Sequence, residues 1–304
     1  MIYTDFNINE HGFAGHMAEP DGSSDRAVII VMGGEQSLLP GIKFAERFAD
    51  YGITGLAVSL FGAEGLPDSP NAIPLDMFIP AVDILKQKGI DHLSIYGQSM
   101  GSIFAVLAAQ YIGGFENLIM VSPTHVPFEG TASDKKTMSG RSVVTWNGED
   151  IPYVKEDFST VKAVKYYRYP GLDHKVTGMW IAYRKAYENI FMEKRAMLHP
   201  ENSNARILLI AGHMDECWPA EYSVRRIQNH LQVIGYKKDV KVIIYPHGSH
   251  LNGLMPNRER EKKLYRMLPV IGLMYRTFGK YKKENIGYFE QSEKEIISWI
   301  TSTT

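Results

Sequence analysis

The sequence predicts an α/β fold built around a doubly wound, mostly parallel β-sheet. Short, continuous apolar runs typical of strands covered on both faces occur at residues 27–31, 53–61, 92–96, 118–121, 207–210 and 240–245. Segments with apolar residues at helical spacing lie between most of them, at residues 42–51, 75–88, 102–109 and 221–234. Strands that alternate with helices in this way form a parallel sheet with helices on both faces. Such sheets bind ligands beyond the carboxyl ends of their strands.

The remaining segments flank this sheet or interrupt it. Residues 1–25 are polar with a loose alternation, so we expect at most an edge hairpin there. Residues 126–205 form a long insertion, polar at first and predicted to be helical over 176–198. The chain is expected to close with an amphipathic helix near Phe289 and Trp299. We predict one domain over residues 1–304, whose insertion covers the ligand-binding face as a helical cap.

Composition and charge argue against a nucleic-acid-binding protein, a protein with internal disulfides and an integral membrane protein. The formal net charge is −1, so the charge balance gives no case for nucleic-acid binding. Cys217 is the one cysteine, which excludes an internal disulfide and suits a reducing compartment. The first residues lack the features of a signal peptide, and no apolar run reaches transmembrane length. We therefore expect a cytoplasmic protein without an integral membrane segment, of unknown oligomeric state.

The segment Gly97-Gln98-Ser99-Met100-Gly101, a G-x-S-x-G pattern, is the centre of the predicted chemistry. A strand precedes it and a helix follows it, which is the setting of a nucleophile elbow. The glycines on either side of Ser99 allow strand and helix to approach closely. We expect the Ser99 hydroxyl to stand above the sheet as a nucleophile. The backbone N–H of Met100, at the helix start, is expected to stabilise an oxyanion.

A second oxyanion-hole amide is expected in the loop after the strand at 27–31. Gly33 and Gly34 suit a backbone that must come close to substrate. Either Gly34 or Glu35 would supply the N–H group, and the sequence does not choose between them. An ordinary strand-to-helix turn is the alternative interpretation.

A serine nucleophile needs a base within hydrogen-bond reach, and the base needs an orienting group. His250 follows the last predicted core strand in a loop of small and polar residues, and we assign it as the base. Asp215 follows the strand before it and is the expected acid that holds the histidine tautomer. The order Ser, Asp, His is that of α/β-hydrolases. His247 and Glu216 are the nearest rivals for base and acid.

Two further residues are candidates for substrate binding. His125 follows the strand at 118–121, where it would line the pocket or serve as a hydrogen-bonded structural histidine. Trp180 belongs to a stripe of Met and aromatic residues, which would line an acyl site or form plain packing surface. Cys217 lacks an elbow, so we interpret it as packing. No His, Cys or Asp spacing matches a metal site, and we expect neither a metal nor a cofactor.

Taken in order, these motifs resemble the C-terminal catalytic domain of acyl-CoA thioester hydrolases and bile acid-CoA:amino acid N-acyltransferases. The resemblance runs over roughly residues 26–255 and includes Gly33-Gly34, residues 74–83, the G-x-S-x-G segment, residues 122–130, residues 146–153, Gly212 to Asp215, Trp218-Pro219 and Tyr245 to His250. Residues 122–130 and 146–153 are more specific to the family than the elbow. The resemblance implies an α/β-hydrolase fold with its triad on Ser99, Asp215 and His250.

Two departures from the family pattern bear on function. Eukaryotic members carry a β-sandwich domain before the catalytic domain, and none is expected in these 304 residues. The acyltransferase branch uses a cysteine nucleophile, whose thioester favours an amine acceptor, whereas Ser99 favours water. A basic extension at about residues 254–287 is peculiar to this chain. It is interpreted as a solvated charged face, with contacts to CoA phosphates or to an anionic membrane surface as alternatives.

The predicted function is a serine hydrolase that cleaves an acyl thioester, such as acyl-CoA, or a carboxylic ester through an acyl-enzyme. The expected partner is therefore a small-molecule acyl substrate. Two alternatives stay open. One is an acyl-CoA N-acyltransferase that conjugates the acyl group to an amino acid. The other is a catalytically silent α/β-hydrolase that acts as a binding protein.

Overall fold

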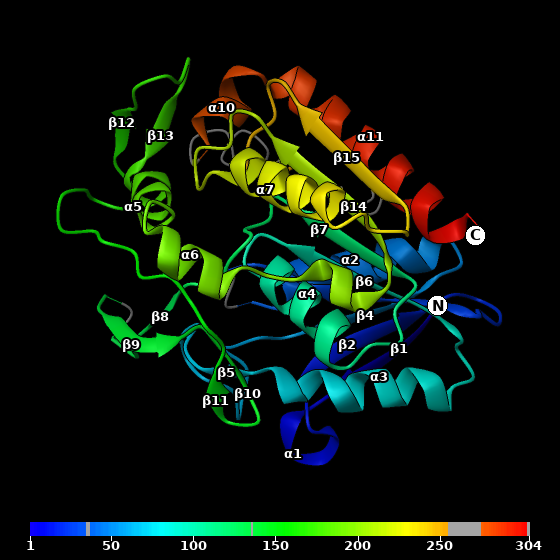
Figure 1. The fold of residues 1–304 in the computed structure, drawn as a ribbon. Coiled ribbons are helices and arrows are strands. Elements are labelled where there is room, and N and C mark those ends of the chain that lie inside the picture. Colours follow the sequence, from blue (N-terminus) through cyan, green and yellow to red (C-terminus); the bar gives the residue numbers. More distant parts are fainter. Residues whose placement is uncertain (35–36, 135, 255–274, 303–304) are drawn as a thin grey trace.

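The computed structural model of the protein describes residues 1–34, 37–134, 136–254 and 275–302. Within them, a central sheet of eight strands has the order β1-β2-β4-β3-β6-β7-β14-β15 (Figure 1). The strands are β1 (Ile2–Phe6), β2 (Gly15–Glu19), β3 (Arg26–Val31), β4 (Thr54–Val58), β6 (His92–Gln98), β7 (Asn117–Val121), β14 (Arg206–Gly212) and β15 (Val240–Tyr245). The six strands from β4 to β15 pair in parallel, and β2 is antiparallel to β1 and β4. The predicted α/β-hydrolase fold, with a doubly wound and mostly parallel sheet, is confirmed.

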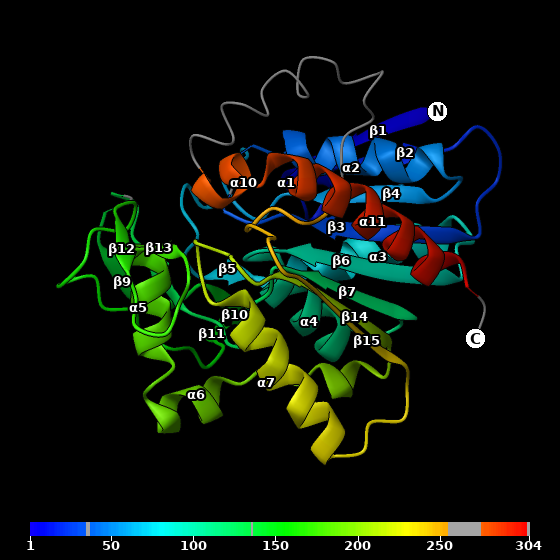
Figure 2. The ribbon, with the colours of Figure 1, turned by 90° about the horizontal axis from the view of Figure 1, so that it is seen from above.

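Helices cover both faces of the sheet, as Figure 2 shows from above. One face carries α2 (Leu39–Asp50) and α11 (Lys282–Thr301), and the other carries α3 (Phe78–Gln87), α4 (Gly101–Tyr111) and α7 (Ala220–Val233). Two apolar clusters fill these layers. Phe48 of α2 and Ile296 of α11 belong to one cluster, and Phe104 of α4 belongs to the other. Burial on both faces explains why the core strands read as continuous apolar runs.

The N-terminal residues form the expected hairpin at the sheet edge. β1 pairs with β2 over five residue pairs, and the short helix α1 (Ile8–His11) lies between them. β2 also pairs with β4, so β1 alone is the edge strand of this side.

Most of the insertion, residues 126–196, lies beyond the carboxyl ends of the core strands on the left of Figure 1, and the chain then returns to α4 through residues 200–203. The elements of the insertion are β8 (Glu129–Thr131), β9 (Met138–Ser142), β10 (Val144–Trp146), β11 (Glu149–Asp150), β12 (Tyr166–Arg168), β13 (Lys175–Thr177), α5 (Gly178–Ala186), α6 (Ile190–Ala196) and the 3₁₀ helix η2 (Pro200–Ser203). The insertion also contacts the core through β5 (Ile73–Pro74), which pairs with β10 and precedes η1 (Leu75–Met77).

The prediction that residues 176–198 are helical is confirmed for most of this segment. Lys175–Thr177 is strand β13, and the helical part is divided into α5 and α6. Side-chain caps explain where α5 and α6 begin, because the side chain of each N-cap residue accepts a hydrogen bond from a backbone N–H in the first turn of its helix. Thr177 accepts from the N–H of Trp180, and Asn189 accepts from the N–H of Met192.

The described structure resumes at residue 275 and continues to residue 302. Most of the predicted basic extension, residues 255–274, lies outside the described residues. Its last part forms α10 (Arg276–Lys280) and the first turn of α11. Every helix of the described residues is too short or too polar to cross a bilayer.

Candidate active site

Ser99 occupies a sharp turn between β6 and α4. Its φ is +57°, a left-handed conformation that few residues other than glycine adopt, and its N–H donates to the carbonyl of Val121 at 2.9 Å. A Cβ at Gly97 would lie 2.6 Å from the carbonyl oxygen of Gly101. A Cβ at Gly101 would lie 2.1 Å from the carbonyl oxygen of Val31. The two glycines therefore allow β6, α4 and the end of β3 to meet around Ser99.

The structure brings Ser99, His250 and Asp215 together, each in the loop that follows its own strand. His250 Nε2 lies 2.9 Å from Ser99 Oγ, and His250 Nδ1 lies 2.7 Å from Asp215 Oδ2. The imidazole thus stands between a hydroxyl and a carboxylate, within hydrogen-bond distance of both. Ser99 is partly exposed, while Asp215 and His250 are buried.

Asp215 is held by backbone amides of its own loop. Its Oδ1 accepts from the N–H of Cys217 at 2.8 Å and from the N–H of Trp218 at 3.3 Å. Its Oδ2 faces His250, so both oxygens of a carboxylate that is only 2% exposed have partners. Because the carboxylate cannot rotate without losing these bonds, it fixes the orientation of the imidazole.

Residues that the sequence analysis did not assign support the His250 loop. The Ser122 hydroxyl donates to the His250 carbonyl at 2.6 Å. Trp218 packs edge-on against the imidazole, with ring centroids 5.2 Å apart, and its Nε1–H donates to the Ser122 carbonyl at 2.9 Å. Asn285 of α11 accepts from the N–H of Ser249 at 2.9 Å. Ser122 and Trp218 lie in segments that carry the resemblance, but no sequence signal connects Asn285 with this loop.

The rival residues are engaged elsewhere. His247 stacks on Tyr281 with ring centroids 4.1 Å apart. Glu216 accepts from the N–H of Thr277 at 3.0 Å, and burial raises the pKa of its carboxyl to about 7. Burial also raises the pKa of the Cys217 thiol well above its usual value. A thiol held protonated is a poor nucleophile, which agrees with the interpretation of Cys217 as packing.

The residues expected to form the oxyanion hole are placed as follows. Met100 directly precedes α4, where backbone N–H groups have no partner within the helix. Gly34 is exposed in the loop after β3, and a Cβ there would meet no atom within 4 Å. Glu35 lies outside the described residues.

His125 is fully buried and lies in a hydrogen-bond network. Its Nδ1 lies 2.9 Å from Ser223 Oγ, and its Nε2 lies 3.0 Å from Glu193 Oε1. Arg226 of α7 donates to both oxygens of Glu193 at 3.0 Å. Burial lowers the pKa of the His125 imidazole. With both ring nitrogens occupied, His125 links α6 and α7, which favours the structural alternative of the two roles predicted for it.

Trp180 borders a cavity next to Asp215. The cavity has a volume of about 350 Å³, and its lining includes Trp180, Asp215 and Trp218. Tyr169 packs edge-on against Trp180 with ring centroids 4.9 Å apart. This placement keeps Trp180 as a candidate for substrate contact, whereas Phe191 of the same stripe is 73% exposed.

Comparison with known proteins identifies the family of this chain. Residues 73–254 match the family described as BAAT / Acyl-CoA thioester hydrolase C terminal. Human acyl-coenzyme A thioesterase 6 is 22% identical over 212 residues, which are 68% of this chain and 44% of that protein. The chain thus spans less than half the length of this curated relative.

Solved structures with a similar arrangement have low sequence identity. TT1662 from Thermus thermophilus is 14% identical with a TM-score of 0.49, over 83% of this chain and 92% of that chain. Est1E from Butyrivibrio proteoclasticus, in a structure with bound ferulic acid, is 17% identical with a TM-score of 0.43, over 82% of this chain and 91% of that chain.

The family match covers more than half of the chain and includes Ser99, Asp215 and His250. The chain therefore belongs to the BAAT / acyl-CoA thioester hydrolase C-terminal family of α/β-hydrolases.

Proposed function

We propose that the protein is a serine hydrolase that cleaves acyl thioesters, and carboxylic esters as a second class, through an acyl-enzyme. The observation that carries this proposal is the continuous hydrogen-bonded chain from Ser99 Oγ through the His250 imidazole to Asp215. In this chain Ser99 is the nucleophile, His250 is the base and Asp215 is the acid that orients the base. Family membership supports the thioester as the bond attacked.

In the first half-reaction, Ser99 Oγ attacks the acyl carbonyl carbon while His250 Nε2 takes the hydroxyl proton. Asp215 stabilises the imidazolium that results, because its Oδ2 accepts from Nδ1–H. The carbonyl oxygen becomes an oxyanion near the N–H of Met100 and the amide of the Gly34 loop. Collapse of this intermediate expels the thiolate or alkoxide, which takes the proton from His250.

In the second half-reaction, water replaces the leaving group. His250 Nε2 takes a proton from the water as it attacks the Ser99 ester, and the proton then returns to Ser99 Oγ as the carboxylic acid departs. The insertion at residues 126–205 acts as a cap over this chemistry in our proposal. Its residue Trp180 and the loop residue Trp218 would contact the acyl group through the cavity beside Asp215.

The test combines active-site labelling with a comparison of substrates. A fluorophosphonate probe should add once to Ser99, as shown by intact mass and peptide mapping, and the Ser99→Ala variant should not react. The same preparation is then assayed on an acyl-CoA and on the p-nitrophenyl ester of the same acid. Released CoA is measured with a thiol reagent, for which the background is low because Cys217 is the one cysteine and is 8% exposed.

We expect Ser99→Ala to lower turnover of the thioester by at least about 10⁴-fold. Conjugates formed on addition of glycine or taurine would instead favour an acyltransferase. Absence of both labelling and turnover would contradict the proposal and favour a binding protein.

A further inference from the structure

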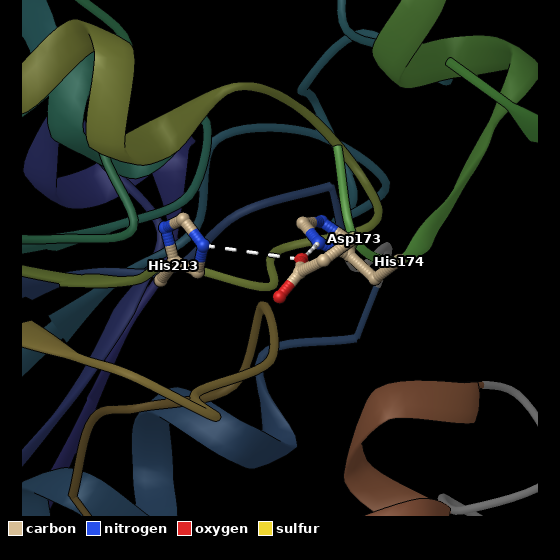
Figure 3. Close-up of side chains that lie close together, drawn as sticks. All are labelled: Asp173, His174 and His213. Atoms are coloured by element: carbon tan, nitrogen blue, oxygen red, sulfur yellow. Dashed lines mark hydrogen bonds and ion pairs between the residues drawn. The ribbon is translucent and has the colours of Figure 1, made fainter. Parts of the chain in front are cut away.

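A cluster of metal-ligating side chains lies at the junction of the insertion and the core. Asp173 and His174 belong to the loop between β12 and β13, and His213 belongs to the loop that carries Asp215. One ligand atom from each residue lies within 4.8 Å of the other two. Figure 3 shows one Asp173 oxygen between the two histidines. Asp173 and His174 are neighbours in the sequence, but His213 is far from both, so their spacing matches no metal motif.

Glu221 fixes the tautomer of the His213 ring that can coordinate a metal. Its Oε2 lies 2.6 Å from His213 Nδ1, so this nitrogen carries the proton as a donor. The lone pair is then on Nε2, the nitrogen that faces Asp173. A carboxylate that accepts from the second ring nitrogen is the usual support of a metal-binding histidine.

The gap between His213 and Asp173 fits a metal better than a direct bond. His213 Nε2 lies 4.0 Å from Asp173 Oδ1, beyond hydrogen-bond distance, and His174 Nδ1 lies 2.9 Å from the same oxygen. Two tetrahedral ligands of zinc at about 2.0–2.1 Å are roughly 3.3–3.4 Å apart. A movement of the exposed Asp173 carboxylate away from His174 and towards His213 would bring both distances to this value.

His174 is ready to supply the third ligand. Its side chain is only 8% exposed, and within the described residues its Nε2 is buried without a hydrogen-bond partner. The tautomer that binds a metal through Nδ1 carries its proton on Nε2, so the ion would replace the present hydrogen bond from Nδ1–H to Asp173. Asp173 and His213 are 64% and 43% exposed, so an ion and a water ligand can enter from solvent.

The other two clusters of this kind in the described residues are already satisfied. In one, Glu201 Oε1 lies 2.8 Å from His199 Nδ1 and 2.7 Å from His230 Nε2, so both histidines donate to it. In the other, Asp215 and His250 bond directly to each other beside the protonated Cys217 thiol.

We propose that Asp173, His174 and His213 form a binding site for Zn²⁺ or a similar divalent transition metal, with Glu221 as its supporting carboxylate. Two imidazoles and one carboxylate form a donor set suited to zinc. A bound ion would tie the β12–β13 loop of the insertion to the loop that carries Asp215. His174 and His213 line the same cavity as Trp180, so a bound ion would border the proposed substrate contact, and the test below therefore measures metal binding without turnover.

The test uses Co²⁺ as a spectroscopic probe on the full chain. His199→Ala and His230→Ala are introduced together as the background, so that the second histidine cluster cannot contribute. We expect one equivalent of Co²⁺ to give visible ligand-field absorption that Zn²⁺ abolishes. His213→Ala should weaken Zn²⁺ affinity at least tenfold, and Glu221→Gln by about 10- to 100-fold.

Folding of each variant is checked by its thermal transition without metal, and Zn²⁺ should raise the transition temperature of the background protein only while His213 is present. Lack of ligand-field absorption in the background protein would overturn the proposal. So would equal Zn²⁺ affinity before and after His213→Ala, because the metal would then lie elsewhere.

Discussion

Asn285 of α11 holds the backbone of Ser249, the residue before the proposed base. Its Oδ1 accepts from the Ser249 N–H at 2.9 Å, and its Nδ2 donates to the His247 carbonyl at 2.9 Å. Both Asn285 and Ser249 are fully buried. A helix at the end of the described chain therefore positions the loop that brings His250 to Ser99.

Asn285→Ala should impair both stability and reactivity. The change leaves the buried Ser249 N–H without its acceptor, which costs about 1–3 kcal/mol. We also expect fluorophosphonate to label Ser99 at least about tenfold more slowly, because a displaced imidazole activates the hydroxyl less well. Gly287→Ala on the same helix is the control, since a Cβ there meets no atom within 4 Å. Equal labelling rates in wild type and Asn285→Ala would refute this positioning role.

Gly101→Ala in the elbow and Gly34→Ala in the loop after β3 form a matched pair of glycine substitutions. A Cβ at Gly101 would lie 2.1 Å from backbone oxygen, while a Cβ at Gly34 meets nothing within 4 Å. We expect Gly101→Ala to lower the free energy of unfolding by about 3 kcal/mol or more, and Gly34→Ala to change it by less than about 0.5 kcal/mol. Urea unfolding of both variants measures this. A Gly101→Ala protein as stable as wild type would mean that the elbow is less tightly packed than described.

Glu156 should make stability depend on pH. It is buried in the insertion with Oε1 unpartnered within the described residues, and burial raises the pKa of its carboxyl to about 8 from 4.5. The folded state holds the Glu156 proton more tightly than the unfolded state does, so protonation of this carboxyl stabilises the fold. This stabilisation is complete below pH 4.5 and is lost as the pH rises through 8. Between pH 5 and 8 the free energy of unfolding should therefore fall by roughly 2–4 kcal/mol on this account.

The Glu156→Gln variant should remove this slope, because a neutral amide does not titrate. Urea unfolding at pH 5, 6.5 and 8 compares it with wild type and with Glu149→Gln, a change at an exposed carboxyl of the same insertion. If the slope of Glu156→Gln matched that of wild type, another group would be responsible.

His125→Ala and Trp180→Ala should separate packing from substrate contact. Loss of the His125 ring removes its links to Ser223 and Glu193, so we expect a loss of about 2–4 kcal/mol in stability with KM changed less than about twofold. Trp180→Ala should raise KM by about tenfold, because it borders the cavity beside Asp215. Steady-state kinetics on one acyl-CoA checks both, and a larger KM effect at His125 would reverse the assignment.

Local patterns were sufficient for most of the sheet and for the three candidate catalytic residues. The apolar run at residues 27–31 became β3, and the helical spacing at 221–234 became α7, because periodicity and burial act over a few neighbouring residues. Ser99, Asp215 and His250 each follow a strand, and parallel strands bring their carboxyl ends to one edge of the sheet. Chain order and strand direction together therefore predicted their convergence.

The sequence by itself thus determined the α/β class, the elbow and the loops that carry the candidate triad. Only the tertiary structure decided that Asn285 supports Ser249, that His125 bonds to Glu193, and that His213 faces Asp173. These contacts join residues on elements far apart in the chain. Asn, His and Asp are also common at solvent-exposed positions, so their presence in the sequence does not indicate these contacts. Their roles arise from how the insertion and α11 pack against the core, which depends on long-range contacts that no local pattern encodes.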